Sequence, residues 1–380
     1  MKKTLAAVAV LGAFAGSALA ADVQLYGIVD TGLAYSHVDA DGNALGDFDS
    51  FSMESGQASG SRWGLKGTED LGNGLTVGFI LENGFTSDDG ADSEPMFNRE
   101  SSLFIQGAFG KFAMGRMGAL NNGQSSWSKI GMINAFGTSF GEYTARADRI
   151  FSTAGQWDNM VAYETPDFAG FKVYAQYAMG SADENESTSD RFYSLGATYN
   201  NGPFASYFAI DSINYATAGA DGTPTADDSL TVTLGGSYDF EVVKVYLGAQ
   251  YFDEVKLSSF GGAFNAWDTL DGNWKFKGYS VSLSADAPVA GGKVMFGLGY
   301  VDAESSDWAN DYGFSGAMDV DFKRYVVSVG YDYPFSKRTD VYAVASYMQD
   351  QSDWNPTDGG ASTSWDPSAY SVIIGLRHKF

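Results

Sequence analysis

The sequence is a succession of short segments in which apolar and polar side chains alternate residue by residue. The last segment, Ser368 to Phe380, shows this most clearly, with an apolar row made of Tyr370, Val372, Ile374, Leu376, His378 and Phe380. Because successive side chains of a β-strand point to opposite sides, each such segment is predicted to be a strand with two unlike faces. We expect sixteen of them, beginning near Val23, Gln57, Leu75, Arg99, Phe112, Asn159, Phe171, Arg191, Phe204, Leu230, Val242, Phe276, Gly292, Val320, Asp340 and Ser368.

The connections between these segments alternate between two sizes. Short turns are expected at 71–74, 110–111, 166–170, 200–203, 239–242, 288–292 and 334–338. Longer connections are expected near 37–56, 85–98, 117–157, 180–190, 212–229, 254–275, 304–318 and 349–367. A soluble sandwich has no reason to sort its loops in this way, whereas an outer-membrane barrel has short periplasmic turns, long outer loops and aromatic girdles. The predicted fold is therefore an all-β, transmembrane, 16-stranded antiparallel β-barrel.

The two ends of the chain fit this prediction. A last strand with a bare apolar edge would aggregate unless it were paired, so its expected partner is the first strand, Val23 to Tyr35. Residues 1–20 read as a cleaved signal peptide, with Lys2 and Lys3, an apolar run and small residues before the cleavage site after Ala20. Residues 21–380 then form a single barrel domain.

Composition excludes several classes of function. The chain has no cysteine, so an exported protein of this kind has neither disulfides nor thiolate metal sites. It carries 23 Lys and Arg, two of them Lys2 and Lys3 of the predicted signal peptide, against 47 Asp and Glu. Such an acidic chain repels phosphates, so nucleic acid is not an expected partner.

Four stretches resemble a known family. They are 23–32 (VQLYGIVDTG), 62–72 (RWGLKGTEDLG), 109–116 (FGKFAMGR) and the terminal Phe380. Together they resemble the Gram-negative general porins, particularly the beta-proteobacterial type, over the whole predicted mature length. The resemblance implies a homotrimer of water-filled barrels in the outer membrane, a third long loop folded inward, and passive passage of small hydrophilic solutes and ions. It also implies that Phe380 and its strand are the signal read by the outer-membrane barrel assembly machinery.

The third long connection, residues 117–157, is the expected constriction. The strand before it alternates only from Lys111 to Arg116, which is too short to cross the membrane, so the chain should leave the wall at mid-height. A connection of this length in a compact barrel is usually functional or disordered. Its apolar residues, Trp127, Ile130, Met132, Ile133, Phe136, Phe140 and Tyr143, favour packing against the inner wall.

Charges facing each other across a narrow lumen set its selectivity. Arg62 and Lys66 share a face opposite Trp63 and Leu65 and should point inward. By resemblance, Arg62, Arg99 and Arg116 form the basic half of the constriction. On strand parity Arg99 and Arg116 fall on the apolar face, so inward pointing requires a bulge or twist, for example at Gly115. The expected loop charges of the constriction are Glu142, Asp148, Arg146 and Arg149.

The outer loops are rich in acids, including Asp88, Asp89, Asp92 and Glu94. Solvation explains them adequately, and no cofactor is expected. A second interpretation is loose binding of calcium or magnesium, which would bridge these acids to phosphates of lipopolysaccharide among the outer-membrane lipids. The segment 39–50 begins like a calcium-binding loop but has Ala44 and Ser50 where glycine and glutamate are needed, so it is rejected as one.

Catalysis is not expected. The two histidines, His37 in a loop and His378 on the predicted lipid face, are not placed to activate a nucleophile. The alternative functions are a substrate-specific channel for a sugar, carboxylate or peptide, and a closed barrel acting as an adhesin or anchor. The first would need an ordered row of side chains along the lumen. The alternation of the strands predicts four inward-facing tyrosines as candidates, Tyr174, Tyr207, Tyr246 and Tyr342. The second is disfavoured because sixteen strands leave a channel unless a plug fills it.

Overall fold

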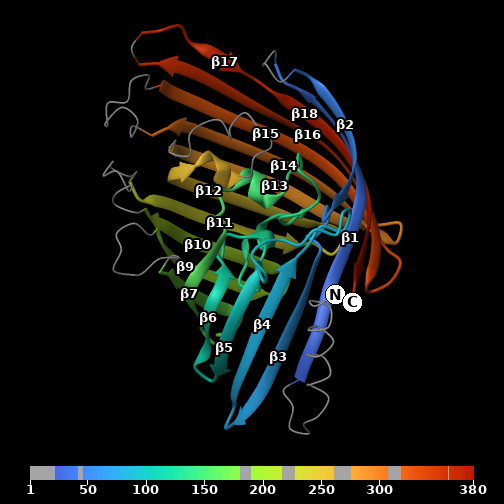
Figure 1. The fold of residues 1–380 in the computed structure, drawn as a ribbon, viewed down its shortest axis with the longest axis vertical. Helices are drawn as coiled ribbons and strands as arrows, with labels where there is room; N and C mark the ends of the chain where they lie inside the picture. Colours follow the sequence, from blue (N-terminus) through green and yellow to red (C-terminus); the bar gives the residue numbers. More distant parts are fainter. Residues whose placement is uncertain are drawn as a thin grey trace.

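The structure is a computed structural model of the chain, and it describes residues 22–41, 46–179, 190–215, 227–260, 275–306, 318–357 and 359–380. The predicted signal peptide, residues 1–20, lies outside these described residues, as do large parts of the connections expected near 180–190, 212–229, 254–275 and 304–318. Figure 1 shows the strands as one curved wall, with the segment after β6 lying inside it.

The wall is built from antiparallel strands, and only short helical turns accompany it. The strands are β1 (Asp22–Asp39), β2 (Phe48–Ser55), β3 (Arg62–Gly72), β4 (Leu75–Gly84), β5 (Glu100–Gly107), β6 (Gly110–Gly118), β7 (Gln156–Glu164), β8 (Phe171–Ala178), β9 (Arg191–Asn201), β10 (Phe204–Asn214), β11 (Ser229–Asp239), β12 (Lys244–Lys256), β13 (Lys275–Val289), β14 (Gly292–Ser305), β15 (Met318–Pro334), β16 (Thr339–Pro356), β17 (Thr363–Trp365) and β18 (Ser368–Lys379). The helical turns are η2 (Ile130–Ile133), α2 (Ala147–Ile150) and η3 (Leu257–Phe260). No helix among the described residues is long and apolar enough to cross a membrane.

The barrel closes where the sequence predicted. β1 pairs with β18 from Ile28 opposite Lys379 to Asp39 opposite Ser368, and β18 pairs with β16 on its other side. The other edge of β1 pairs with β3 along its first half and with β2 along its second half. β2 and β3 thus act as one wall strand, and the three-residue β17 only extends the rim beside β16, so the wall has sixteen strands.

One predicted strand boundary is wrong. The second wall strand, expected to begin near Gln57, begins at Phe48, opposite Val38, and is interrupted between β2 and β3. The interruption has a local cause, since the buried Asp30 carboxylate accepts hydrogen bonds from the backbone N–H groups of Ala58 and Ser59. Those groups are thereby drawn out of the strand ladder and into the barrel.

The outward face of the wall is apolar, as the alternation predicted. On β12, Leu247 is 62% exposed whereas its neighbour Tyr246 on the inner face is 9% exposed. Aromatic side chains gather near the strand ends, where Tyr279, Tyr300 and Tyr325 form a chain of rings with centroids 6.2 and 5.2 Å apart. Rings at the ends of lipid-facing strands suit the two interfaces of a membrane.

The buried packing lies inside the barrel, between the wall and residues 119–155. Glycines on inward-facing positions make room for it. A Cβ on Gly248 would lie 2.7 Å from Phe151 Cζ and 2.9 Å from Ile133 Cδ1, and a Cβ on Gly299 would lie 2.4 Å from Ile150 Cδ1. The wall is therefore shaped to receive the apolar side chains of this segment.

We predict that Gly299→Leu displaces the segment 119–155 without unfolding the barrel. Overpacking of this kind costs about 1–3 kcal/mol, and here the cost falls on contacts with Ile150. Tryptic cleavage after Lys129, Arg146 or Arg149 should become faster while the heat-modifiable mobility of the folded barrel persists on gels. Leu298→Val on the neighbouring outward position is the control, and equal cleavage of both variants would contradict the prediction.

Candidate functional site

The inward loop starts where β6 ends. β6 is nine residues long, its register with β7 shifts between Gly115 and Met117, and the chain leaves the wall after Gly118. It returns at Gln156, the first residue of β7. We call residues 119–155 the constriction loop.

Hydrogen bonds hold the constriction loop against the inner wall over several strands. The backbone N–H of Ala135 donates to Ser284 Oγ at 2.9 Å, and that of Ala145 donates to Ser328 Oγ at 2.8 Å. Ser152 N–H donates to Gln250 Oε1 at 2.7 Å. These partners lie on β12, β13 and β15, so the loop covers a large part of the wall from inside.

A second contact ties the tip of the loop to the gap between β2 and β3. The backbone N–H groups of Phe140 and Gly141 both donate to the carbonyl oxygen of Gln57, in the interruption between β2 and β3. That interruption is fixed by Asp30, which is fully buried and accepts from Ala58 N–H at 2.9 Å, Ser59 N–H at 2.6 Å and Tyr342 Oη at 2.5 Å. The position of the loop tip therefore depends on one buried carboxylate.

Arg62 and Arg99, two of the residues predicted for the basic side of the constriction, are brought together by Glu82 on the inner wall. Arg62 lies opposite the buried Ile28 and thus faces inward, and its Nε is 3.5 Å from Glu82 Oε2. Arg99 Nε is 2.7 Å from Glu82 Oε1. Arg99 precedes β5, which begins at Glu100, so strand parity does not govern it and no bulge is needed. Two arginines thus share one carboxylate.

Lys66 also faces inward, with its Nζ 5.1 Å from the centre of the Tyr26 ring. Arg116 differs from the expectation. The irregularity at Gly115 is present, with φ +134°. Arg116 nevertheless pairs with Ser101, and both are at positions whose side chains point out of the barrel. There it forms an ion pair with Asp158 at 2.5 Å and donates to Asn98 O, so the structure does not bring it together with Arg62 and Arg99.

Arg377 on β18 joins the basic side, and sequence reasoning missed it. Its Nε donates to Asp340 at 3.0 Å, its Nη2 lies 3.5 Å from Asp332, and its Nη1 donates to Ser59 Oγ at 2.9 Å. The available signal was its place between the apolar residues of the last strand, which puts it on the inner face. Its partnership with Ser59 joins positions far apart in the sequence, which no local pattern indicates.

The charges on the constriction loop alternate in sign. Arg146 Nε is 3.0 Å from Asp148 Oδ1, and Arg149 Nε donates to the Glu142 carbonyl at 2.9 Å. Burial raises the pKa of the Glu142 carboxyl, the neighbouring Arg149 and Arg146 oppose this rise, and Glu54 on β2 adds to it. Burial lowers the pKa of Arg149 to about 10, so this guanidinium still carries its charge at neutral pH.

A buried ion pair supports the loop from behind. Arg324 and Asp350, on β15 and β16, are 2% and 0% exposed and form a two-pronged pair at 2.7 and 2.8 Å. Arg324 Nη1 also donates to the carbonyl oxygens of Arg149 and Phe260 at 3.2 Å each. The sequence indicated only that Arg324 alternates with apolar residues.

The tyrosines considered as a row along the lumen do not form one. Tyr174, Tyr207, Tyr246 and Tyr342 are 3%, 1%, 9% and 1% exposed. Tyr207 donates to Asn121 of the constriction loop, and Tyr342 donates to Asp30. Covered and hydrogen-bonded in this way, they anchor the loop and its support and offer no continuous aromatic surface to a passing solute.

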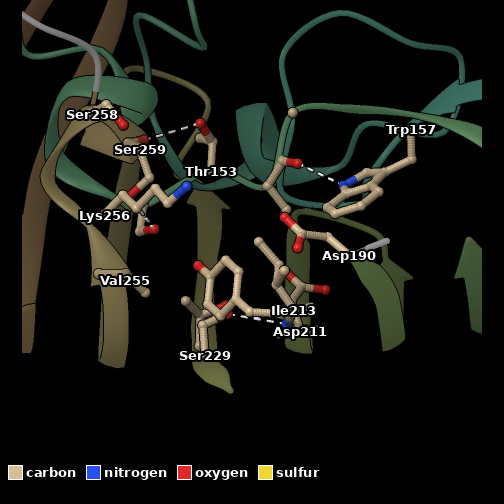
Figure 2. A pocket seen from close by; sticks show the side chains of 15 residues that line it. Thr153, Trp157, Asp190, Asp211, Ile213, Ser229, Val255, Lys256, Ser258 and Ser259 are labelled. Carbon is tan, nitrogen blue, oxygen red and sulfur yellow. Dashed lines mark hydrogen bonds between the residues drawn. The ribbon is translucent and has the colours of Figure 1, made fainter. Parts of the chain in front are cut away.

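A side cavity of about 350 Å³ lies beside the returning limb of the loop (Figure 2). Its lining includes Asp211 on β10, Ser229 on β11, Lys256 on β12, Thr153 at the end of the loop and Trp157 on β7. These strand ends adjoin long connections, so the cavity belongs to the outer half of the barrel. It leaves room next to the loop at the end opposite the tip.

The described residues contain no group of three or more His, Cys, Asp or Glu side chains able to hold a metal ion. His37 is 3.1 Å from Asp49, and His378 is 2.8 Å from Thr339 Oγ1. Both contacts are exposed. Paired charges from β3, β4, β18 and the residue before β5 lie on the inner wall, and we infer that the passage through the barrel runs between them and the constriction loop.

We predict that Asp30→Ala widens this passage. Removing the carboxylate frees the backbone around Gln57 and with it the loop tip, so single-channel conductance should rise and become noisier. Asp22→Ala, an acid at the exposed start of β1, is the matched control. Tyr342→Phe, which removes a single hydrogen bond worth about 0.5–1.5 kcal/mol, should give a smaller change of the same sign. Unchanged conductance in folded Asp30→Ala would contradict the prediction.

A second prediction concerns pH. Because burial raises the pKa of Glu142, this group gains its proton at a higher pH than an ordinary carboxyl as the solution is acidified. As the solution is acidified from neutral pH, the lumen therefore loses this negative charge before ordinary carboxyls are protonated, and the anion share of the current should rise. Glu142→Gln should abolish this early step in the reversal potential. If the reversal potential of the variant and of the parent changed with pH in the same way, the prediction would be refuted.

Comparisons with known proteins agree with this geometry. The family model for Gram-negative porins matches residues 6–353. An outer membrane porin protein of Bordetella pertussis is 34% identical, and outer membrane porin protein 32 of Delftia acidovorans is 30% identical; each alignment covers 100% of both chains.

Solved structures show the same fold. The anion-selective porin from Comamonas acidovorans superposes with a TM-score of 0.65 at 26% identity, covering 95% of this chain and 100% of that one. OmpT of Vibrio cholerae superposes with a TM-score of 0.63 at 19% identity, covering 96% and 99%. A family match over most of the chain, a closed sixteen-stranded barrel and an inward loop lead to one conclusion. The chain belongs to the Gram-negative porins, outer-membrane β-barrels that form water-filled channels for passive diffusion of small hydrophilic solutes and ions.

Proposed function

We propose that this porin is a general diffusion channel with a preference for anions, and that Arg62, Lys66, Arg99 and Arg377 form the basic side of its constriction. The observation that carries the preference is that Arg62 and Arg99 share the single carboxylate of Glu82, which leaves one positive charge uncompensated. The 26% identical solved relative described as anion-selective supports the same sign.

The net negative charge of the whole chain would favour cations, but it has little influence on an ion in the constriction. Charges separated by more than the screening length of ~8 Å at physiological salt hardly influence a passing ion. Many of the acids, such as Asp88 and Asp89, are exposed residues of the long connections, where solvent screens them. On the loop, Glu142 and Asp148 are offset by Arg149 and Arg146.

The finer assignments of partners are part of this proposal. We propose a homotrimer, with the outer loops meeting lipopolysaccharide and their acids loosely binding calcium or magnesium, and with no catalytic role. We also propose Phe380 as the residue read by the barrel assembly machinery. Its support is that Phe380 exchanges two backbone hydrogen bonds with Gly27, at 3.1 and 3.2 Å, at the point where the barrel closes.

The test is the reversal potential of the purified protein in a planar bilayer across a salt gradient. We expect an anion preference that increases in Glu82→Gln and decreases in Arg99→Gln, because these variants remove opposite charges from one cluster. Lys293→Gln, at the short-turn end of β14, controls for the loss of a distant charge. A cation preference of the parent would place Glu142 and its neighbours in control, and verified insertion without conductance would overturn the open channel.

A further inference from the structure

Two lysines, one on the wall near a short turn and one on the constriction loop, face the same part of the lumen. Lys111 is the second residue of β6, directly after a short turn, and it pairs across the wall with Gln106 on β5 and Glu164 on β7. Lys129 comes from the constriction loop, just before η2. Its Nζ lies over the ring of Tyr174. Tyr174 is on β8 and pairs with Glu164 of β7. Both ammonium groups therefore lie over the inner wall formed by β5 to β8, close enough for the charge of Lys111 to act on Lys129.

Aromatic rings hold both ammonium groups in place. Lys111 Nζ is 4.3 Å from the centre of the Phe104 ring and 5.0 Å from that of Trp127. Lys129 Nζ is 5.2 Å from the centre of Tyr174. The face of an aromatic ring attracts a cation but carries no net charge, so these contacts orient the ammonium groups without neutralising them.

The carboxylates nearest to the pair are engaged elsewhere. Glu164 is ion-paired with Lys172 at 2.6 Å. Glu100 accepts hydrogen bonds from Ser102 Oγ at 2.8 Å, Ser126 N–H at 2.9 Å and Ser126 Oγ at 3.0 Å. Within the described parts of the chain, no carboxylate lies within 4.0 Å of Lys111 or Lys129 Nζ, and Lys129 Nζ donates only to Ser126 O, at 3.5 Å.

This pair differs from most of the arginines at and behind the constriction. Arg62, Arg99, Arg146, Arg324 and Arg377 each lie within 3.5 Å of a carboxylate oxygen. Burial lowers the pKa of Lys129; Glu164 opposes this, and the positive charges of Lys111 and Lys172 add to it. A bound anion would relieve both the burial cost and the repulsion.

We propose that Lys111 and Lys129 form a binding site for small oxyanions carrying two negative charges, such as hydrogen phosphate or a short dicarboxylate, on the periplasmic side of the constriction loop. Two ammonium groups fixed from separate elements match two negative charges on one solute. A monovalent anion would leave one of them uncompensated. The inference rests on the proposed channel function and adds to it a weak, saturable step after the constriction.

The experiment measures chloride current through the purified full-length porin in a planar bilayer while sodium succinate or sodium phosphate is added on both sides. Current should fall with a saturable dependence on the divalent anion. In Lys111→Gln/Lys129→Gln the midpoint should move to at least about tenfold higher concentration, since a charge-assisted hydrogen bond is lost at each position. Lys111→Arg/Lys129→Arg should retain the effect.

The matched control is Lys244→Gln. Lys244 is also next to a short turn, on β12, and its Nζ is 5.0 Å from the centre of the Tyr246 ring. It lies on a strand far round the barrel from Lys111 and Lys129. Its midpoint should equal that of the parent. The folded state of every variant is checked by heat-modifiable gel mobility and by uptake of a neutral sugar into liposomes.

Each outcome decides the proposal. The salt with the lower midpoint, succinate or phosphate, shows whether the site prefers dicarboxylates or phosphate. A conducting channel without saturation, formate acting as strongly as the divalent salts, or an equal shift in Lys244→Gln would overturn the lysine site while leaving the channel function standing. Absence of any chloride current would instead overturn the channel function.

Discussion

The rest of the structure depends on the hydrogen-bonded edges of β1. A wall in contact with lipid must satisfy every backbone N–H and C=O group internally, because the hydrocarbon offers no partner. β1 does this by pairing with β18 along one edge and with β3 and β2 in turn along the other. The change of partner leaves residues 56–61 outside the ladder, and the buried Asp30 side chain of β1 accepts hydrogen bonds from two of their N–H groups, those of Ala58 and Ser59. The loop tip is bonded to that gap, so closure of the wall and width of the passage have a common origin.

The sequence predicted what depends on alternation and length. The strand count, the closure of the ends, the inward loop and the orientation of Arg62 and Lys66 all follow from period-two patterns and connection sizes. Alternation could not reveal contacts between distant positions, such as Arg377 with Ser59 or Arg324 with Arg149. It also failed where β2 and β3 are interrupted, because the cause is the carboxylate of Asp30 on a neighbouring strand. Arg116 faces outward, as strand alternation indicated, and the resemblance to the family was wrong to place it with Arg62 and Arg99.

Formal charge is a poor guide to the field inside this porin. Most arginines around the constriction are held by carboxylates at short range, which fixes their geometry but reduces their effect on a passing ion. A lysine seated on an aromatic ring keeps more of its charge available. Selectivity then depends less on how many basic residues line the lumen than on which of them have an acidic partner.

The constriction loop is bonded to residues between Gln57 and Ser328, a span that includes most of the wall. Its final contacts cannot all exist until β15 has taken its register beside β14 and β16. The width of the passage is thus set jointly by strands from both halves of the chain, and a substitution that shifts the register of β15 would act on the constriction even though it lies far from the loop in sequence.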